Sequence, residues 1–388
     1  MTRMAQRVQG FGTTIFAEMT ALANRHHAVN LGQGFPDFAA PAFIKEAARE
    51  SIARDINQYA PGIGQPRLRR AIAAKMERHY GLGVDPDAEV TVTVGATEAI
   101  FAAIMGLVDP GDEVIFFEPY YDSYLPSLQF AGGAPRFYTL QPPEWTIDIQ
   151  ALAALFNEKT KLIVVNTPHN PTGKVYSREE LELIARLCQE HDVIALVDEV
   201  YEHVTFDGGQ HHSLITFPGM RERTLSISSA GKTFSVTGWK VGWAVGAPEL
   251  ARAVFRAHQF ITYSGAAPLQ EATARAIEVA DERGYYEELG AMYQQRRNYL
   301  LDALQNAGLR PIRPRGTYFV MVDISDLGFE DDVAFCRHLT TEVGVAAIPP
   351  SAFYTTPGGG QTLARFAFCK TEAALEEAAR RLRRWHGG

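Results

Sequence analysis

Short apolar segments alternate with helix-length segments along the middle of the chain, and this alternation limits the possible folds more than any other feature. The apolar segments are rich in Val, Ile and Leu, are bounded by turn residues, and lie at 89–94, 113–117, 161–166, 193–198 and 224–228. Such segments are typical of strands buried on both faces. Helical stretches lie between several of them, for example at 97–108 and 177–191. The pattern predicts an α/β fold whose mostly parallel sheet is wrapped by helices, with right-handed crossovers.

The pattern changes in the last third of the chain. A long helical stretch at 269–306 is followed by a strand-like segment at 318–324, a helical one at 331–343, a strand-like one at 363–368 and a helical one at 371–385. We therefore expect a smaller α/β layer that the long helix joins to the first.

Charge and cysteine content exclude several classes of protein. With 37 Lys+Arg against 45 Asp+Glu the formal charge is 37 − 45 = −8, which repels phosphate backbones and anionic membrane surfaces. No signal peptide and no run of eighteen apolar residues without a charge is present, so we expect neither a membrane partner nor a nucleic-acid partner. Cys188, Cys336 and Cys369 are scattered and form no CxxC pair, which predicts a reducing, cytoplasmic setting.

The segment SISSAGKTFSVTGWKVGW at 226–243 carries two lysines after a predicted strand. Lys232 is not a P-loop lysine, because Ser226 stands where the first glycine of GxxxxGK[ST] is required. The alternative is a lysine that forms a Schiff base, which needs a water-poor pocket and a nearby positive charge to lower its pKa. Lys240 and the neighbouring glycines could supply a phosphate site beside it.

Eight motifs occur in an order and at spacings that match one known family. They are NLGQGFPDF (30–38), NQYA (57–60), TVGATEA (93–99), FEPYYDSY (117–124), NTPHNPTG (166–173), VDEVYEH (197–203), the lysine segment and RFAF (365–368). In these motifs the chain resembles the fold-type I, pyridoxal-phosphate-dependent aminotransferases of class I/II, particularly the kynurenine/glutamine and methionine aminotransferase branch. The resemblance implies pyridoxal 5'-phosphate as cofactor. It also implies a large domain with a mostly parallel seven-stranded sheet flanked by helices, and a smaller C-terminal α/β domain.

From the pattern and the resemblance together we expect three parts. Residues 1–40 would form an N-terminal arm and part of the small domain, 41–275 the large cofactor-binding domain, and 276–388 the small C-terminal domain.

A predicted strand meets a predicted helix at 94–98. Gly95 permits the turn, and the amides of Ala96 and Thr97 are free to hold an anion at the positive end of the helix, where we expect the cofactor phosphate. The alternative is a glycine turn with Thr97 as an ordinary N-cap. Ser229 and Lys240 would complete the phosphate site. The family often has Arg at the position of Lys240, so this residue would bind the phosphate as a point charge rather than through a bidentate fork.

Asp198 ends an apolar strand, where an unpaired buried carboxylate would be costly. Paired with a protonated pyridine nitrogen, it would keep the cofactor ring cationic and able to accept electrons. Without the resemblance, Asp198, Glu199, Glu202 and His203 could suggest a metal cluster. Alternation along a strand end points these side chains in different directions, so we expect no metal.

Further roles come from the resemblance alone. Lys232 would hold the cofactor and move the substrate proton, Tyr201 would bond the cofactor's phenolic oxygen, and Asn170 would share that oxygen with the substrate carboxylate. Tyr121 would stack on the ring of the cofactor. Its neighbour Tyr120 would take this role if the motif were aligned one residue earlier. Read on their own, Asn170 lies in a proline turn and either tyrosine would be part of the core.

The expected substrate anchor is Arg365 in a strand-like segment, because its planar fork suits bidentate capture of an α-carboxylate. A lone strand arginine is otherwise usually a surface residue. By resemblance, Gly32 lets the backbone approach the same carboxylate, Tyr59 reaches the phosphate of the neighbouring subunit, and Tyr263 lines the pocket across the interface. We therefore expect a homodimer with shared active sites.

The predicted activity is a ping-pong transfer of the amino group of a neutral L-amino acid to a 2-oxo acid. Methionine is favoured over glutamine, aromatic amino acids and kynurenine. Dicarboxylate-specific relatives add a cation for the distal carboxylate, whereas the pocket residues expected here are aromatic. These aromatic residues are Phe16, Phe35, Tyr59, Tyr121, Tyr263 and Phe353.

Three other functions remain as alternatives. A C–S β-lyase acting on cysteine conjugates would use the same fold. A pyridoxal-phosphate-binding transcription regulator would need a DNA-binding module, and about thirty residues before Gly32 are too few for one. A nicotinamide-dependent oxidoreductase is disfavoured, because Arg67 stands where the last glycine after Gly62 and Gly64 is required.

Overall fold

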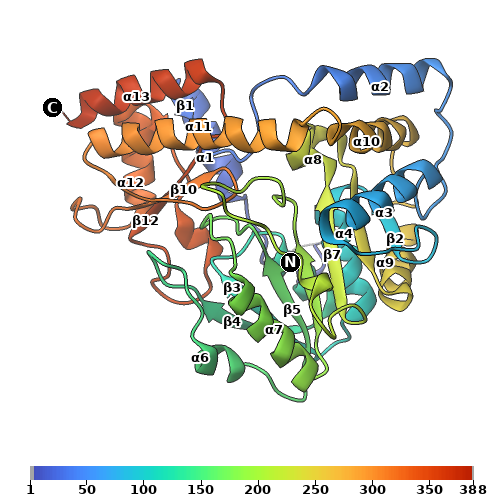
Figure 1. Cartoon of the computed structure of the whole chain (residues 1–388). Coiled ribbons are helices and arrows are strands. Elements are labelled where there is room, and N and C mark those ends of the chain that lie inside the picture. The colour runs from blue at the N-terminus through green and yellow to red at the C-terminus, as the bar shows by residue number, and fades with distance from the viewer. Residues whose placement is uncertain (1–3, 387–388) are drawn as a thin grey trace.

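A seven-stranded sheet forms the centre of the molecule (Figure 1). The computed structural model describes residues 4–386, so residues 1–3 and 387–388 of the predicted first and last domains lie outside the described residues. The strands are β2 (Val90–Thr93), β3 (Glu113–Glu118), β4 (Ala134–Thr139), β5 (Thr160–Asn166), β6 (Ile194–Asp198), β7 (Thr224–Ser229) and β8 (Gly242–Gly246), in the order β2-β8-β7-β6-β5-β3-β4. Only β8 runs antiparallel to its neighbours, which confirms the predicted mostly parallel sheet.

Helices cover both faces of this sheet because its strands are apolar on both sides. Val114 and Phe116 of β3 pack on one face, whereas Ile115 and Phe117 pack on the other. The first face is covered by α4 (Gly95–Leu107), α5 (Tyr124–Ala131) and α9 (Pro248–Ile261), and the second by α6 (Ile149–Ala153) and α7 (Arg178–Glu190). A further layer beside β2 and β8 consists of α2 (Ala42–Ala53), α3 (Pro66–Tyr80) and α10 (Ala267–Ala280).

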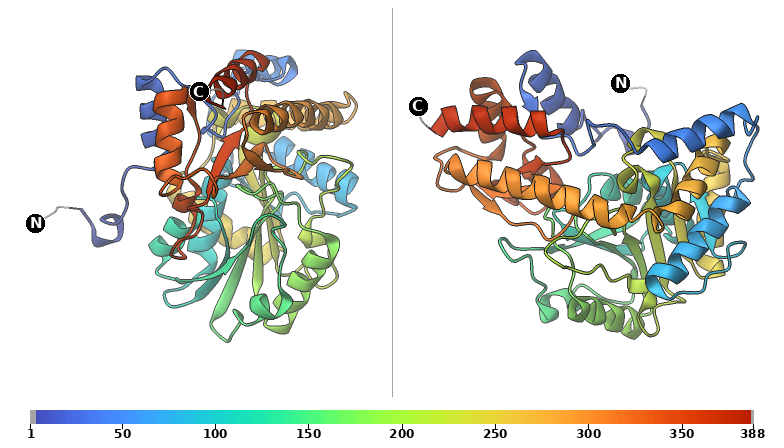
Figure 2. Two further views of the ribbon diagram at one scale, coloured as in Figure 1. Left: turned by 90° about the vertical axis from the view of Figure 1, so that its left-hand side faces the viewer. Right: turned by 45° about the horizontal axis from the view of Figure 1, so that its top comes forward.

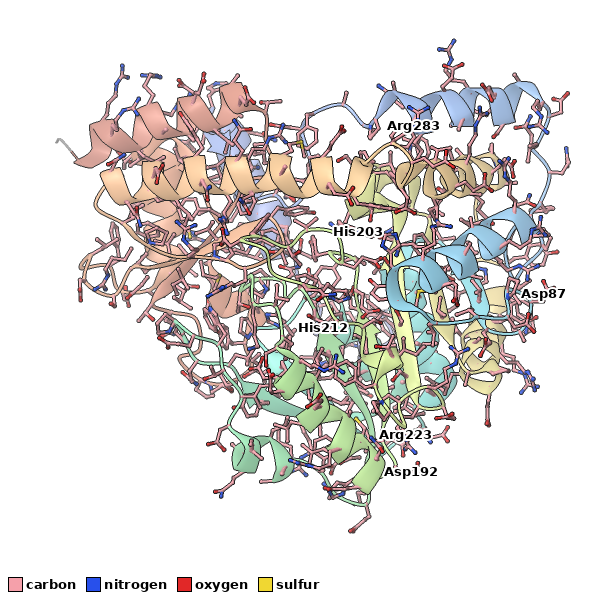
Figure 3. The ribbon with its side chains drawn as sticks, viewed as in Figure 1. Asp87, Asp192, His203, His212, Arg223 and Arg283 are labelled. Carbon is pink, nitrogen blue, oxygen red and sulfur yellow. The ribbon has the colours of Figure 1, made fainter. Side chains whose placement is uncertain are left out.

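The amino ends of the central strands are tied together by charge. Arg223, just before β7, forms an ion pair at 2.8 Å with Asp192, just before β6 (Figure 3). The opposite edge, at the carboxyl ends of the strands, holds the site described below.

Two smaller sheets lie beside the large one. The antiparallel sheet has the order β12-β10-β9 and contains β9 (Arg310–Ile312), β10 (Phe319–Asp323) and β12 (Leu363–Ala367). The second sheet pairs β1 (Val29–Asn30) in parallel with β11 (Val345–Ala346), so the beginning of the chain is held against its end. The helices of this part are α1 (Ile15–Arg25), α12 (Asp332–His338) and α13 (Glu372–His386), while the segment before α1 projects from the body (Figure 2). The domain boundaries at 40/41 and 275/276 stay predictions.

The prediction of one helix over 269–306 is wrong. The stretch forms α10 and then α11 (Tyr285–Asn306), separated by a turn in which Gly284 has a left-handed φ of 63°. A residue with a Cβ adopts this conformation only at a cost, so the glycine lets the chain change direction. Helix α11 then runs from the large sheet to the small one (Figure 1). The stretch predicted as one helix at 331–343 also divides, into α12 and a π-helical turn at Leu339–Val343.

Short helical turns complete the chain at Gln6–Val8, Leu214–Thr216, Ala230–Thr233 (α8), Thr237–Trp239 and Pro350–Phe353. Among residues 4–386, no helix is long and apolar enough to cross a membrane. The three cysteines are free and buried.

Candidate active site

A cavity of about 340 Å³ lies at the carboxyl ends of β5, β6 and β7, where the N-terminal segment and the small antiparallel sheet meet the large sheet. In open α/β sheets ligands bind at this edge. Most of the predicted site residues line the cavity, and they are Gly95, Ala96, Thr97, Tyr121, Asn170, Asp198, Tyr201, Ser229, Lys232, Lys240 and Arg365. Residues predicted from distant motifs, on chemical grounds or by the resemblance, are therefore brought to one place.

Lys232 projects from α8, directly after β7. Its Nζ donates hydrogen bonds to the Tyr318 hydroxyl at 2.9 Å and to the Gly34 carbonyl at 3.3 Å. Burial lowers the pKa of Lys232 to about 8, an effect that Asp198 opposes and the charge of Lys240 assists. The lowered pKa makes the neutral amine, which is the form that a nucleophile requires, far more accessible near physiological pH than for an exposed lysine.

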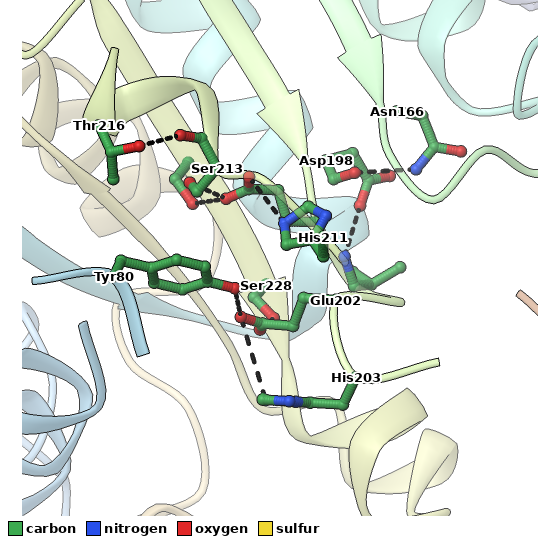
Figure 4. A network of polar contacts seen from close by, with 12 residues as sticks. Tyr80, Asn166, Asp198, Glu202, His203, His211, Ser213, Thr216 and Ser228 are labelled. Atoms are coloured by element: carbon green, nitrogen blue, oxygen red, sulfur yellow. Dashed lines mark hydrogen bonds and ion pairs between the residues drawn. The ribbon is translucent and has the colours of Figure 1, made fainter. Parts of the chain in front are cut away.

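Three carboxylates at the end of β6 face three different surroundings (Figure 4). Asp198 faces the cavity, where its Oδ2 accepts a hydrogen bond from the Tyr124 hydroxyl at 2.7 Å. Burial raises the pKa of Asp198 to about 6, although the hydrogen bond from Tyr124 and the charge of Lys232 oppose this shift.

The other two carboxylates point away from the cavity. Glu199 is bonded by Ser213 at 3.0 Å and lies 3.2 Å from His211 Nε2. Glu202 forms a buried ion pair with Lys75 at 2.5 Å and accepts a bond from Tyr80 at 2.6 Å. The three carboxylates weighed as a metal cluster thus have separate partners, and His203 lies 4.0 Å from Glu202 alone among them. Among residues 4–386 no group of His, Cys, Asp and Glu is arranged to hold a metal ion.

The N-terminus of α4 opens into the cavity. The helix begins at Gly95, which has a φ of 80°, so Thr97 is its third residue and the ordinary N-cap alternative for Thr97 is wrong. A Cβ on Gly242 of β8 would lie 2.4 Å from the Gly95 carbonyl carbon and 2.6 Å from the Ala96 nitrogen. Only glycine at 242 lets β8 pass this close to the start of the helix.

Lys240 adds a positive charge at the same place. Its backbone is left-handed, with a φ of 52°, and its Nζ would lie 3.4 Å from a Cβ on Gly95. Ser229, the last residue of β7, lines the same wall. Helix amides, a hydroxyl and an ammonium group together make an anion site.

Arg365 lies on β12 and is 1% exposed, so the alternative of a surface arginine is wrong. Its Nη1 donates to Asn170 Oδ1 and its Nη2 to the Gly32 carbonyl, both at 3.1 Å. Its Nε has no partner among the described residues. Burial lowers the pKa of Arg365 to about 10, and the guanidinium lies 4.2 Å from the ring centroid of Phe319. A buried cation with an unused N–H is suited to a carboxylate ligand.

Gly32 itself lies behind Arg365 rather than on the cavity wall. Its N–H donates to Asn30 Oδ1 at 3.0 Å, and its carbonyl contacts Arg365. A direct bond from Gly32 to a substrate stays a prediction.

The tyrosine register is settled by position. Tyr121 lines the cavity, whereas Tyr120 is buried against Phe137, with ring centroids 5.8 Å apart. Tyr201 also lines the cavity, and its ring packs edge-on against Tyr318 at 5.0 Å. Burial raises the pKa of Tyr201, so its hydroxyl stays protonated and can donate a hydrogen bond.

Three of the aromatic residues expected in the pocket lie elsewhere. Phe16 and Phe35 line the cavity, but Phe353 lies behind Phe16, with ring centroids 5.8 Å apart. Tyr59 and Tyr263 are 84% and 53% exposed and contact each other edge-on at 5.5 Å on the surface of this chain. Their predicted roles require a second subunit.

Several residues of the site were missed by the sequence reasoning. Asn166 donates to the Asp198 carbonyl at 2.9 Å and accepts from the Asn170 amide at 2.6 Å, so it ties two site residues together. Asn166 and Tyr124 both belong to motifs that carry the resemblance. Asn166 ends β5 and Tyr124 follows β3, so their positions could have indicated that they belong to the site. Tyr318 carries no such signal.

The chain is similar over nearly its whole length to known proteins. Residues 26–382 match the family described as aminotransferase class I and II. The chain is 44% identical over 372 residues to a methionine aminotransferase of Escherichia coli, covering 96% of each chain. It is 42% identical over 410 residues to a kynurenine–oxoglutarate transaminase of Dictyostelium discoideum, covering 96% of this chain and 94% of that one. The solved structure of N-succinyldiaminopimelate aminotransferase from Mycobacterium tuberculosis superposes with a TM-score of 0.95 at 46% identity, covering 98% and 100%.

Proposed function

The chain belongs to the class I and II aminotransferases, and we propose that its cavity moves the amino group of a neutral L-amino acid to a 2-oxo acid. Members of this family depend on pyridoxal phosphate, and the protein is a pyridoxal-phosphate-dependent aminotransferase. One observation carries the proposal: a partly neutral lysine amine and a buried guanidinium with an unused N–H, from Lys232 and Arg365, line the same cavity. The first group can bind a carbonyl carbon and the second a carboxylate.

The cavity residues fit the cofactor. The amides at the start of α4, Ser229 and Lys240 make an anion site that suits the phosphate. Asp198 is a buried carboxylate with a raised pKa, which a protonated pyridine nitrogen would relieve. Tyr121 offers a ring face on the same wall. When bound, the cofactor would supply an aldehyde carbon that accepts the amino group and a ring that takes up the electron pair left on the substrate α-carbon.

Each residue of the chain then has a separate task. Asp198 would stay ionised and stabilise a proton on the pyridine nitrogen, and the bond from Tyr124 fixes the carboxylate in place. Tyr201 and Asn170 would donate hydrogen bonds to the phenolic oxygen of the cofactor. Arg365 holds the substrate carboxylate and so fixes the direction of the α-C–H bond.

Lys232 moves the proton. Its Nζ lies inside the cavity, and the pKa of about 8 would let it take a proton from the substrate α-carbon and donate it to the carbon of the cofactor that receives the amino group. General acid–base catalysis of this kind is typically worth ~10²–10⁴-fold in rate. The second half of the cycle uses the same groups in the reverse direction with a 2-oxo acid.

The charges around the cavity favour a substrate with a neutral side chain. Its cationic lining residues, Lys232, Lys240 and Arg365, all have tasks already, which leaves none for a distal carboxylate. Asp122, on the same wall, would repel such a group, and burial raises its pKa. Phe16 and the other aromatic rings offer apolar contact. The similarity to a methionine aminotransferase adds support for methionine, with glutamine, aromatic amino acids and kynurenine next.

We also propose a cytoplasmic homodimer. The exposed pair Tyr59 and Tyr263, with Phe260 at 88% exposure, forms an apolar surface of the kind that a second copy covers. Tyr59 would then reach the phosphate in the partner's site. The free cysteines support a reducing compartment.

The experiment is a spectral titration of the loaded enzyme. We expect the absorbance of the bound cofactor to change with L-methionine and to return with a 2-oxo acid. Lys232→Ala should abolish both changes, whereas the exposed Lys45→Ala should not alter them. No response to methionine, glutamine, kynurenine or aromatic amino acids would reject the proposed substrates. Release of pyruvate and ammonia from a cysteine conjugate without any 2-oxo acid would instead identify a β-lyase.

A further inference from the structure

The amine of Lys232 rests against two oxygens on one wall of the cavity. Its Nζ is 2.9 Å from the Tyr318 hydroxyl and 3.3 Å from the Gly34 carbonyl. The Tyr318 hydroxyl in turn donates to the same Gly34 carbonyl at 2.6 Å. Because the single hydrogen of this hydroxyl is used for Gly34, the tyrosine oxygen can only accept from Lys232.

The number of hydrogens on the amine makes this arrangement directional. A neutral amine has two N–H bonds and one lone pair, and the two oxygens take both N–H bonds. The lone pair therefore points away from this wall and toward the cavity. In the ammonium form the third N–H points the same way. The amine therefore takes up and releases the proton on the same side, which faces the cavity.

Tyr318 is held firmly enough to set this direction. It is 0% exposed and lies at the start of β10, between the rings of Tyr201 at 5.0 Å and Tyr293 at 5.7 Å. The preceding residue, Thr317, donates from its backbone to the Val204 carbonyl at 2.9 Å. A hydroxyl packed in this way keeps one position while the lysine side chain moves.

We propose that Tyr318, together with the Gly34 carbonyl, is the docking position of the free Lys232 amine and aims it at the substrate α-carbon. Tyr318 is thus a positioning residue that acts through Lys232. The inference rests on the proposed function, since a free amine at 232 is needed only if this lysine exchanges between the cofactor and the proton-transfer task.

The first test measures Lys232 itself in the cofactor-free protein. Competitive labelling with acetic anhydride at a series of pH values, read by mass spectrometry of the Lys232 peptide, gives the midpoint of its titration. The titratable groups that act on Lys232 are Cys369, Asp198, Arg365 and Lys240, and Tyr201 lies beside its amine. None of these side chains changes in Tyr318→Phe, which removes only the hydroxyl that Lys232, Gly34 and Tyr201 share.

We expect the midpoint to fall by about one pH unit in Tyr318→Phe, because the lost oxygen accepts a bond that stabilises the ammonium form. Tyr293→Phe is the matched control, since it removes a hydroxyl from the neighbouring buried ring that makes no bond to Lys232. Its midpoint should equal that of the unaltered protein. An unchanged midpoint in Tyr318→Phe would overturn the proposal. A rise toward the value of an exposed lysine would also overturn it, because the hydroxyl would then act through packing.

The second test uses the loaded enzyme. Tyr318→Phe should lower kcat for the amino donor about tenfold and leave its KM within about twofold, because Arg365 still anchors the substrate. Equal losses in Tyr318→Phe and Tyr293→Phe, or a rise in KM alone, would refute the positioning role. If the unaltered enzyme moves no amino group, the proposed function fails, while the labelling experiment still decides whether Tyr318 docks the amine.

Discussion

Substituting Gly242 by alanine should remove the cofactor from this enzyme without removing any group that touches it. Gly242 lies on β8 where the strand passes the start of α4. An added Cβ would lie 2.4 Å from the Gly95 carbonyl carbon and 2.6 Å from the Ala96 nitrogen, and both atoms belong to the backbone. Neither can rotate out of the way, so β8 and the helix start must separate by about 1 Å to restore ordinary van der Waals contact.

The expected magnitude follows from the bonds that this movement breaks. The amides of Ala96 and Thr97 are the proposed phosphate donors, and a hydrogen bond to a charged group contributes ~1.5–3 kcal/mol. Losing two such bonds costs ~3–6 kcal/mol, which corresponds to ~10²–10⁴-fold weaker cofactor binding, since about 1.4 kcal/mol is tenfold. The strain also destabilises the fold by ~1–3 kcal/mol, as for other overpacked sites.

The assay is the dissociation constant of pyridoxal phosphate, measured by fluorescence on the cofactor-free variants. Gly238→Ala is the matched control in the same segment, because a Cβ there would meet no atom within 4 Å. It should bind the cofactor as the unaltered protein does. If Gly242→Ala binds the cofactor within threefold of the unaltered protein while remaining folded, the assignment of the phosphate to the start of α4 is refuted.

Three further predictions follow from the same site. Arg365→Lys keeps the charge but loses the planar fork, so the KM for the amino donor should rise at least about tenfold; an unchanged KM would exclude Arg365 as the carboxylate anchor. In the cofactor-free protein, burial raises the pKa of Asp198 to about 6 from 3.8, so the folded state binds more protons between these values and loses stability as the pH rises. Denaturant unfolding should show that Asp198→Asn removes a loss of about 3 kcal/mol between about pH 3 and 7, and parallel curves would contradict this. Mixing inactive Tyr59→Ala and Lys232→Ala subunits should restore activity, because the hybrid contains one complete site; no recovery would place Tyr59 in its own subunit's site.

The parts of the site that local sequence could predict are those at strand ends. Asp198 and Lys232 follow two neighbouring buried strands, and the carboxyl ends of parallel strands meet at one edge of the sheet. The position of these residues in the chain and the chemistry of their side chains therefore indicate the same edge. The central sheet could be predicted for a similar reason, because residues that alternate between two buried faces produce continuous apolar runs.

The remaining parts depend on contacts between distant segments. Arg365 reaches Gly32 across almost the whole chain, and Tyr318 reaches Gly34 in the same way. Each of these residues could serve equally well as core or surface in its own segment, so no local pattern distinguishes the outcomes. The break between α10 and α11 was missed because Gly284 is the one residue there that opposes a helix, and a single glycine within a helical pattern is often tolerated.

The pairing of β1 with β11 gives the enzyme an order of completion during its synthesis. The residues proposed to hold the phosphate, from Gly95 to Lys240, have all been synthesised once β8 is made. The substrate anchor requires Arg365. It also requires the pairing of β1 with β11, and β1 is made among the first segments whereas β11 is made near the end. Contacts so distant in the chain form late. A nascent chain can thus acquire its cofactor site before it can hold an amino acid, and a truncated product that lacks β12 would bind the cofactor without competing for substrate.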